Sequence, residues 1–225
     1  MTFYSFIKTA LLASVALFPL IDPIGSAILA NPLLEGLPLA ARRRASKRVA
    51  LYCLIISLVT IVAGSYILMF FGLSIPVVQV GGGLLMCRQS WQLLSLDFRE
   101  KRAAAATIVP TADSVEKRLF YPIAFPLMAG PEVISGLLTL SAHGASTNPL
   151  KLLLNLTALT LGVLLICFLI FVCLARTPWL IHLLGEKGEI IVNQLTAFLF
   201  LCVGIQIAET GVWHIIEGYL NQPIK

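Results

Sequence analysis

Long apolar segments, several of them about 20 residues or more, restrict this chain to a small set of folds. Of its 225 residues, 58% are hydrophobic and only 12% are charged, and the mean hydropathy is +0.93. A helix of about 20 apolar residues crosses the hydrocarbon core of a bilayer, where only helices and closed barrels satisfy the backbone hydrogen bonds. The sequence therefore predicts an all-α polytopic membrane protein with a single membrane domain over residues 1–225.

Six segments are predicted to be transmembrane helices. They cover Phe6–Leu34, Val49–Phe71, Pro76–Leu96, Leu119–Ala142, Leu150–Leu174 and Ile190–Val212. The first segment is too long for one straight crossing at about 1.5 Å per residue, whereas a broken and tilted pair of half-helices fits. We therefore expect the chain to cross the bilayer six times.

Two similar proline-containing motifs interrupt the first and the fourth segments. Phe18-Pro19-Leu20 leads to Asp22-Pro23-Ile24-Gly25, and Phe125-Pro126-Leu127 leads to Gly130-Pro131-Glu132. Corresponding breaks in two halves of a membrane protein point to a midplane site of a transporter, because unwound backbone is tolerated there only where it lines a cavity. Three spans per half is an odd number, so the second half must enter from the opposite face. We expect two inverted repeats, residues 1–96 and 119–225, joined by a linker at 97–118.

Basic residues between the segments predict the orientation. Most follow the first, third and fifth segments: Arg42, Arg43, Arg44, Lys47 and Arg48, then Arg99, Lys101, Arg102, Lys117 and Arg118, then Arg176 and Lys187. These three connections lie on the same face of the membrane, and by the positive-inside rule that face is cytoplasmic. The linker is then cytoplasmic, and both termini are outside. The net charge of +5 is explained by this topology. A nucleic-acid partner is not expected, because no basic surface interleaved with aromatic residues accompanies the charge.

With these motifs and this layout, the chain resembles the MarC family of bacterial inner-membrane proteins. The matching stretches extend over nearly the whole chain, and together they are specific. They are Asp22-Pro23-Ile24-Gly25, Gly72-Leu73-Ser74-Ile75-Pro76 continuing to Gly81-Gly82-Gly83-Leu84, Pro126 to Gly130-Pro131, Leu184-Gly185-Glu186-Lys187-Gly188 and Cys202-Val203-Gly204-Ile205-Gln206.

The resemblance implies a six-span, inverted-repeat fold similar to that of the LysE-like exporters, a location in the bacterial inner membrane and, for some relatives, transport of small neutral amino acids. The family name records a proposed link to multiple antibiotic resistance, which the resemblance alone does not establish. Two acidic residues depart from the family pattern. Asp22 stands where relatives often carry Asn, and Glu132 stands where a second Gly is common.

Each break has the pattern of a helix start. Asp22 before Pro23 reads as an N-cap followed by proline at the first helical position, and Gly130 before Pro131 repeats it, with Glu132 in the first turn. A helix N-terminus presents unpaired N–H groups and about half a positive charge, so it favours an anionic group. In inverted halves the two positive ends would converge from opposite leaflets.

We therefore hypothesise a substrate site formed by Asp22, Pro23, Gly25, Gly130, Pro131 and Glu132. The carboxylate of an amino acid would bind N–H groups near Gly25 or Pro131. Asp22 or Glu132 would face the substrate ammonium or a coupling H⁺ or Na⁺. The alternative is plain capping, in which the two acids only neutralise the helix ends and contribute about 0.3–2 kcal/mol.

Three further polar residues are candidates for coupling or gating. Arg88 lies within the third segment, where an ionisable side chain needs a partner such as Asp22, Glu132 or Glu209, or must snorkel to the cytoplasmic interface. Gln206 and Glu209 are one turn apart on the last segment and would face the cavity. For Glu209 a position at the outer interface is the alternative.

Other motifs are interpreted as packing features. Gly81-Gly82-Gly83 lacks the Gly-Lys-Ser/Thr ending of a phosphate loop, so we expect it to allow close helix approach, as we do for Ala197, Gly204, Ala208 and Gly211. The five cysteines lie in apolar segments without metal-ligand spacing. No metal site and no cofactor are expected, apart from a coupling ion.

The leading function is a secondary transporter for small neutral amino acids similar to alanine or glycine, because no nucleotide-binding motif is present. One alternative is an exporter of drugs or other metabolites, which would favour a roomier cavity lined by aromatic residues. Another class is a structural membrane protein or an intramembrane redox protein or enzyme, although no cysteine adjoins the prolines of the breaks. The sequence leaves the substrate, its direction and homo-oligomer formation open.

Overall fold

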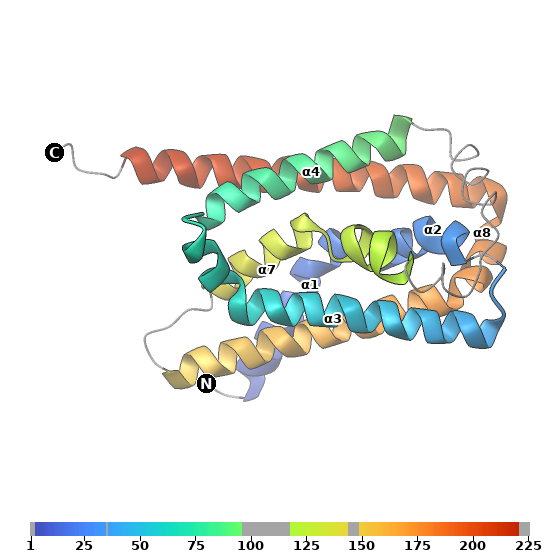
Figure 1. Cartoon of the computed structure of the whole chain (residues 1–225), viewed down its shortest axis with the longest axis horizontal. Helices are drawn as coiled ribbons and strands as arrows, with labels where there is room; N and C mark the ends of the chain where they lie inside the picture. The colour runs from blue at the N-terminus through green and yellow to red at the C-terminus, as the bar shows by residue number, and fades with distance from the viewer. Residues whose placement is uncertain (1–2, 35, 96–117, 144–148, 221–225) are drawn as a thin grey trace.

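The computed structural model describes residues 3–34, 36–95, 118–143 and 149–220, and in these ranges the chain is helical (Figure 1). The all-α class is thereby confirmed. The predicted linker at 97–118 lies outside the described residues except for Arg118. The elements are α1 (Phe3–Ile21), α2 (Pro23–Leu34), α3 (Leu39–Phe70), α4 (Ile75–Ser95), the π-type helix η1 (Leu119–Met128), α7 (Pro131–His143) and α8 (Pro149–Leu220).

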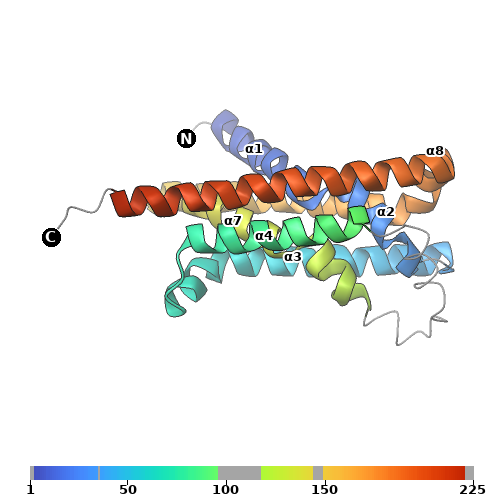
Figure 2. The same ribbon diagram turned by 90° about the horizontal axis from the view of Figure 1, so that it is seen from above.

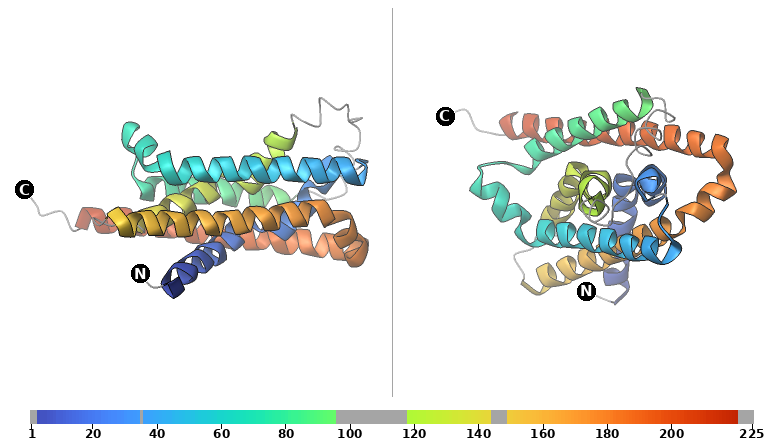
Figure 3. Two further views of the ribbon diagram at one scale, coloured as in Figure 1. Left: turned by 90° about the horizontal axis from the view of Figure 1, so that it is seen from below. Right: turned by 45° about the vertical axis from the view of Figure 1, so that its right-hand side comes forward.

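Both predicted helix breaks are confirmed. α1 and α2 meet at an angle of 42°, and η1 and α7 meet at 55°. Asp22, at the first break, has φ +36°, and Tyr121 and Phe125, inside η1, have extended backbone because each precedes a proline. α2, η1 and α7 lie in the middle of the bundle, between α3, α4 and the two arms of α8 (Figures 1 and 3).

The long helix α8 folds back on itself at Gly185. This residue has φ +66° and ψ 173°, a conformation that glycine adopts without a steric penalty. It divides α8 into two antiparallel arms, Leu152–Gly185 and Ile190–Leu220 (Figure 1). The prediction that the fifth helix ends at Leu174 was therefore wrong, because the helix continues through Pro178 to Gly185.

Three helices are long and apolar enough to cross a membrane: α3 and the two arms of α8. The count among the described residues rises to five if each bent pair is one span. α4 matches the predicted third span, Pro76–Leu96, closely in its bounds but is not among these candidates, because Gln79, the three glycines and Arg88 lower its hydropathy. It packs along the second arm of α8 (Figure 1).

The helix ends are sorted between the two ends of the bundle. The start of α1, the turn between α3 and α4, and the end of α8 lie at one end (Figures 1 and 2). The end of α2, the start of α3, the end of α4 and the turn between the two arms of α8 lie at the other. The basic residues at 42–48 belong to this second end, but α3 begins at Leu39, so the prediction that they form a connection before the helix was wrong.

Small residues let α4 approach its neighbours closely, as predicted for the glycine run. A Cβ on Gly83 would lie 2.5 Å from Gly204 O and 2.6 Å from Ala208 N on α8. A Cβ on Gly211 would lie 2.6 Å from Pro76 O. In lipid, helices associate through such van der Waals contact rather than through the hydrophobic effect. The second arm of α8 and α4 therefore pack backbone to backbone.

Arg42 connects three helices at the second end of the bundle. Its side chain is only 3% exposed. Nε donates to Leu174 O at 3.1 Å, Nη1 to Leu34 O at 3.5 Å, and Nη2 to Asn31 Oδ1 at 2.7 Å. Leu174 O needs a donor because Pro178, four residues later, has no N–H. The Thr177 hydroxyl donates to Cys173 O at 2.7 Å and lies farther from Leu174 O, at 3.2 Å. Arg42 thus supplies the donors that are missing at the end of α2 and opposite Pro178.

Substituting Gly83 by alanine is expected to destabilise the fold by about 1–3 kcal/mol, because its Cβ would overlap backbone atoms of α8. Gly81→Ala is the matched control, since a Cβ there meets nothing within 4 Å. Thermal unfolding of both variants in detergent, followed by circular dichroism, measures the difference. Equal melting temperatures would contradict the close packing of α4 on α8.

Arg42→Lys is expected to lower the free energy of unfolding by about 1.5–3 kcal/mol, because lysine keeps the charge but not the planar fork that reaches three acceptors. The exposed neighbour Arg43 gives the control, Arg43→Lys, which should leave the melting temperature unchanged. If Arg42→Lys is as stable as Arg43→Lys, the three hydrogen bonds do not hold the helices together.

Candidate functional site

The first break is capped by its own acidic residue. Asp22 Oδ1 accepts a hydrogen bond from Gly25 N at 3.2 Å, and Pro23 occupies the first helical position, as predicted. Ser26 Oγ donates to Ile21 O at 2.8 Å, which pairs a carbonyl at the end of α1. The N–H of Gly25 is therefore already hydrogen-bonded within the chain. This geometry corresponds to the alternative in which Asp22 only caps the helix.

Gly25 is also the contact point between this break and the second arm of α8. A Cβ on Gly25 would overlap both the Thr196 side chain and the carboxylate of Asp22. Thr196 is 4% exposed, and Asn193, one turn earlier on α8, is buried with neither amide atom hydrogen-bonded. Sequence reasoning missed both residues. Polar residues spaced i, i+3 in an apolar helix were the signal that could have found them.

The second break carries a buried carboxylate. Ile134 N donates to Gly130 O at 3.1 Å, so Gly130 takes the N-cap position of α7 as predicted. The carboxylate of Glu132 folds back over Gly130. Glu132 is 3% exposed, and its Oε2 has no hydrogen-bond partner. The start of α7 also meets α4, because a Cβ on Gly82 would lie 3.1 Å from Pro131 O.

The two broken pairs lie next to each other. A Cβ on Gly136, one turn after Glu132 on α7, would overlap Leu20, which lies two residues before Asp22. Beside this contact is a cavity of about 300 Å³, here named the central cavity. Its lining comes from α1, α4, α7 and the second arm of α8: Ala16, Pro19, Leu20, Gln79, Ser135, Gly136, Thr139, Leu140, Val203, Gln206, Ile207 and Thr210.

A short hydrogen-bond chain fixes the polar side of the central cavity. Gln79 Nε2 donates to Thr139 Oγ1 at 2.7 Å, and Thr139 Oγ1 donates to Ser135 O at 2.9 Å. Because the Thr139 hydroxyl uses its hydrogen on Ser135 O, it meets Gln79 as an acceptor, and Gln79 must present its NH₂ group there. Gln79 Oε1 and the Ser135 hydroxyl are then buried without a partner.

The predicted site residues are therefore only partly brought together. Of these residues, Gln206 lines the central cavity, and Glu132 lies one turn from Ser135 and Gly136, which also line it. The predicted substrate-binding residues themselves are not among its described lining residues: Asp22, Pro23, Gly25, Gly130, Pro131 and Glu132. Arg88 and Glu209 are exposed and do not line the cavity. The sequence did not identify Gln79, Ser135, Thr139 or Thr210, whose spacing from the prolines carries no local signal.

Comparison with known proteins gives the family. The model of the MarC family integral membrane proteins matches residues 7–216. The inner membrane protein MarC of Salmonella typhimurium is 28% identical, with 92% of this chain and 96% of that protein covered. MarC of Escherichia coli SMS-3-5 is 27% identical, with the same coverage. A membrane protein of Buchnera aphidicola is 25% identical, with 92% and 93% covered. No solved structure matches. The chain belongs to the MarC family of integral membrane proteins.

Proposed function

We propose that this protein is a secondary transporter of the bacterial inner membrane that moves small neutral amino acids through the central cavity. The observation that carries the proposal is the cavity itself, which lies where a broken helix of one half meets the broken helix of the other. Breaks of this kind near the middle of a membrane are tolerated where they line a solute site. Relatives of this chain are named inner membrane proteins, which supports the location.

The size of the central cavity favours a small solute. Its volume of about 300 Å³ is at the lower limit of small-molecule sites. None of its lining residues is aromatic, whereas a drug-binding site would be expected to present aromatic and other large apolar surfaces. An alanine-sized or glycine-sized solute therefore fits this site better than an amphipathic drug.

The chemistry of the cavity favours a solute without net charge. No Asp, Glu, Lys or Arg is among the described residues that line it. Gln79 Oε1 is an unpaired acceptor that can bind a substrate ammonium, and the Ser135 hydroxyl can donate to a substrate carboxylate. An acceptor on Gln79 and a donor on Ser135, both uncharged, suit a zwitterion. Neither the ammonium nor the carboxylate of the solute would then be repelled by a charged side chain in the lining.

Glu132 is proposed as the group that takes up a coupling proton. An ionisable residue inside a membrane-spanning segment is costly and usually serves a proton or ion pathway. Glu132 is buried at the start of α7 with one oxygen unpaired, and it lies one turn from Ser135. Asp22, whose oxygen binds Gly25 N, is assigned the capping role.

The proposal includes six crossings in two inverted halves. α4 is taken as the third crossing because its length and its packing along α8 match those of a span. The basic end of the bundle would be cytoplasmic, and both chain termini would then lie outside. The grouping of helix ends in Figure 1 is consistent with this arrangement.

Counterflow of radiolabelled alanine or glycine in proteoliposomes tests the solute site. Ser135→Ala and Gln79→Leu are each expected to reduce apparent affinity about tenfold, because each removes a hydrogen bond to a charged group of the solute. Ser65→Ala and Gln92→Leu are the controls, since both residues are exposed. Absence of flux for a panel of small neutral amino acids would contradict transport and favour a non-transport role.

A pH gradient tests the coupling role. Glu132→Gln is expected to abolish accumulation driven by the gradient, while counterflow, which needs no net proton movement, remains measurable. Glu217→Gln is the control, because Glu217 is exposed near the end of α8. Asp22→Asn should preserve accumulation, since asparagine also caps helices. Accumulation by Glu132→Gln at the rate of the unsubstituted protein would overturn the assignment of Glu132.

A further inference from the structure

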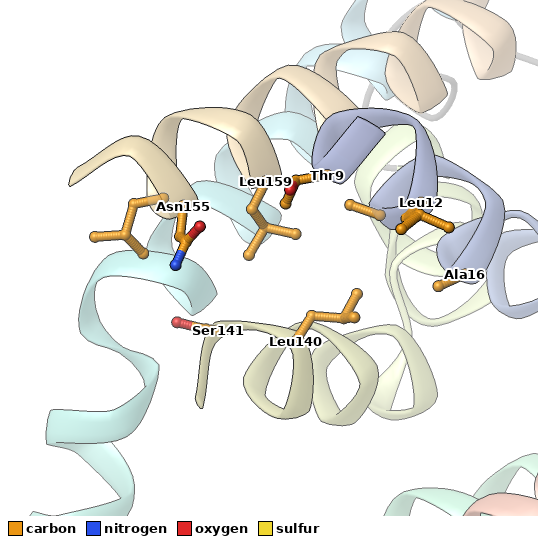
Figure 4. Close-up of a pocket in the computed structure, with 9 residues that line it drawn as sticks. Thr9, Leu12, Ala16, Leu140, Ser141, Asn155 and Leu159 are labelled. Carbon is orange, nitrogen blue, oxygen red and sulfur yellow. The ribbon is translucent and has the colours of Figure 1, made fainter. Parts of the chain in front are cut away.

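A second and larger cavity adjoins the central one. It has a volume of about 430 Å³ and is here named the outer cavity. α1, α7 and the first arm of α8 form its walls, and its lining residues are Thr9, Leu12, Ala13, Ala16, Leu140, Ser141, Asn155, Leu156 and Leu159 (Figure 4). Thr9 lies in the first half of α1 and Asn155 near the start of α8, so the cavity belongs to the end of the bundle where α1 begins.

Ala16 and Leu140 line both cavities. In Figure 4, Ser141 and Asn155 lie at one end of the outer cavity and Ala16 at the other, with Leu140 between them. On α7, Ser141 lines the outer cavity and Ser135 lines the central one. Six residues of helix correspond to about 9 Å, so the two cavities follow each other along the bundle.

Two of the three polar residues that line the outer cavity, Ser141 and Asn155, lie at its far end. The third, Thr9, lies beside Leu159, and the remaining lining residues are leucines and alanines (Figure 4). A polar rim followed by an apolar stretch is the arrangement of a gated solute path, because an apolar constriction closes to water and to polar solutes by dewetting until it widens.

We infer that the outer cavity is the vestibule through which solute reaches the central cavity, and that Ala16 and Leu140 form the constriction between them. The inference rests on the proposed function in naming the solute. The path itself is a property of the fold and can be measured without transport. Ala16 keeps the passage open by its small side chain, and Leu140, on the facing helix, narrows it.

Thiol accessibility in nanodiscs tests the path, because both faces of the membrane are then open to the reagent. Ser135→Cys reports on the central cavity and Ser141→Cys on the outer one, in a background where the exposed Cys202 is replaced by serine. The modification rate by a methanethiosulfonate cation is measured for each. Adding Ala16→Phe should slow modification at position 135 about tenfold, equivalent to about 1.4 kcal/mol, and leave position 141 within about twofold.

A second variant has the opposite predicted effect. Leu140→Ala widens the constriction and should accelerate modification at position 135, so the inference does not depend on tolerance of the bulky side chain. Ala16→Leu serves as a milder block. An unchanged rate at position 135 in both the Ala16 and Leu140 variants, or equal slowing at positions 135 and 141, would overturn the path. Because no solute is involved, an absence of amino-acid flux would contradict the proposed function and leave this result standing.

Discussion

The fold of this protein depends on one constraint, that every backbone polar group inside lipid needs a partner from the chain. Prolines at the breaks and in α8 remove N–H donors and leave carbonyls without their helical partner. The chain supplies substitutes from side chains. The Ser26 hydroxyl pairs Ile21 O near the first break, and Arg42 pairs Leu174 O, which Pro178 leaves without its helical donor. Irregular backbone is thereby kept inside a membrane-spanning bundle.

A second condition is close approach between helices. Gly25, Gly83 and Gly204 each lie where a side chain would overlap a neighbouring element, and at Gly82 it would be tightly packed against α7. These contacts press α4 and the second arm of α8 against the two broken pairs, so that four elements contribute to the wall of one cavity. The polar side of that wall is set by a chain of hydrogen bonds from Gln79 through Thr139 to Ser135 O, which leaves Gln79 Oε1 and the Ser135 hydroxyl buried without a partner.

Local patterns in the sequence predicted the helical class, both breaks, the caps at Asp22 and Gly130, and the packing role of the glycine run. Each of these depends on residues close together in the chain. The ends of α3 and α8 were predicted less well, because Arg42 is buried in a helix and because the donor that Pro178 lacks is supplied by Arg42, 136 positions away. The residues of the cavity wall could not be predicted, because Gln79 and Ser135 are brought to the same cavity only by the packing of α4 on α7. The contact between Thr196 and Gly25 also depends on tertiary packing, here of the second arm of α8 on α2.

The turn at Gly185 has a mechanical consequence. A single residue in a conformation open to glycine separates the two arms of α8, and a Cβ there would meet nothing within 4 Å. Because the connection between the arms is short, lengthwise displacement of the arm that carries Gln206 and Thr210 is limited by the arm before it. The position of this wall of the central cavity is thereby coupled to that of the first arm.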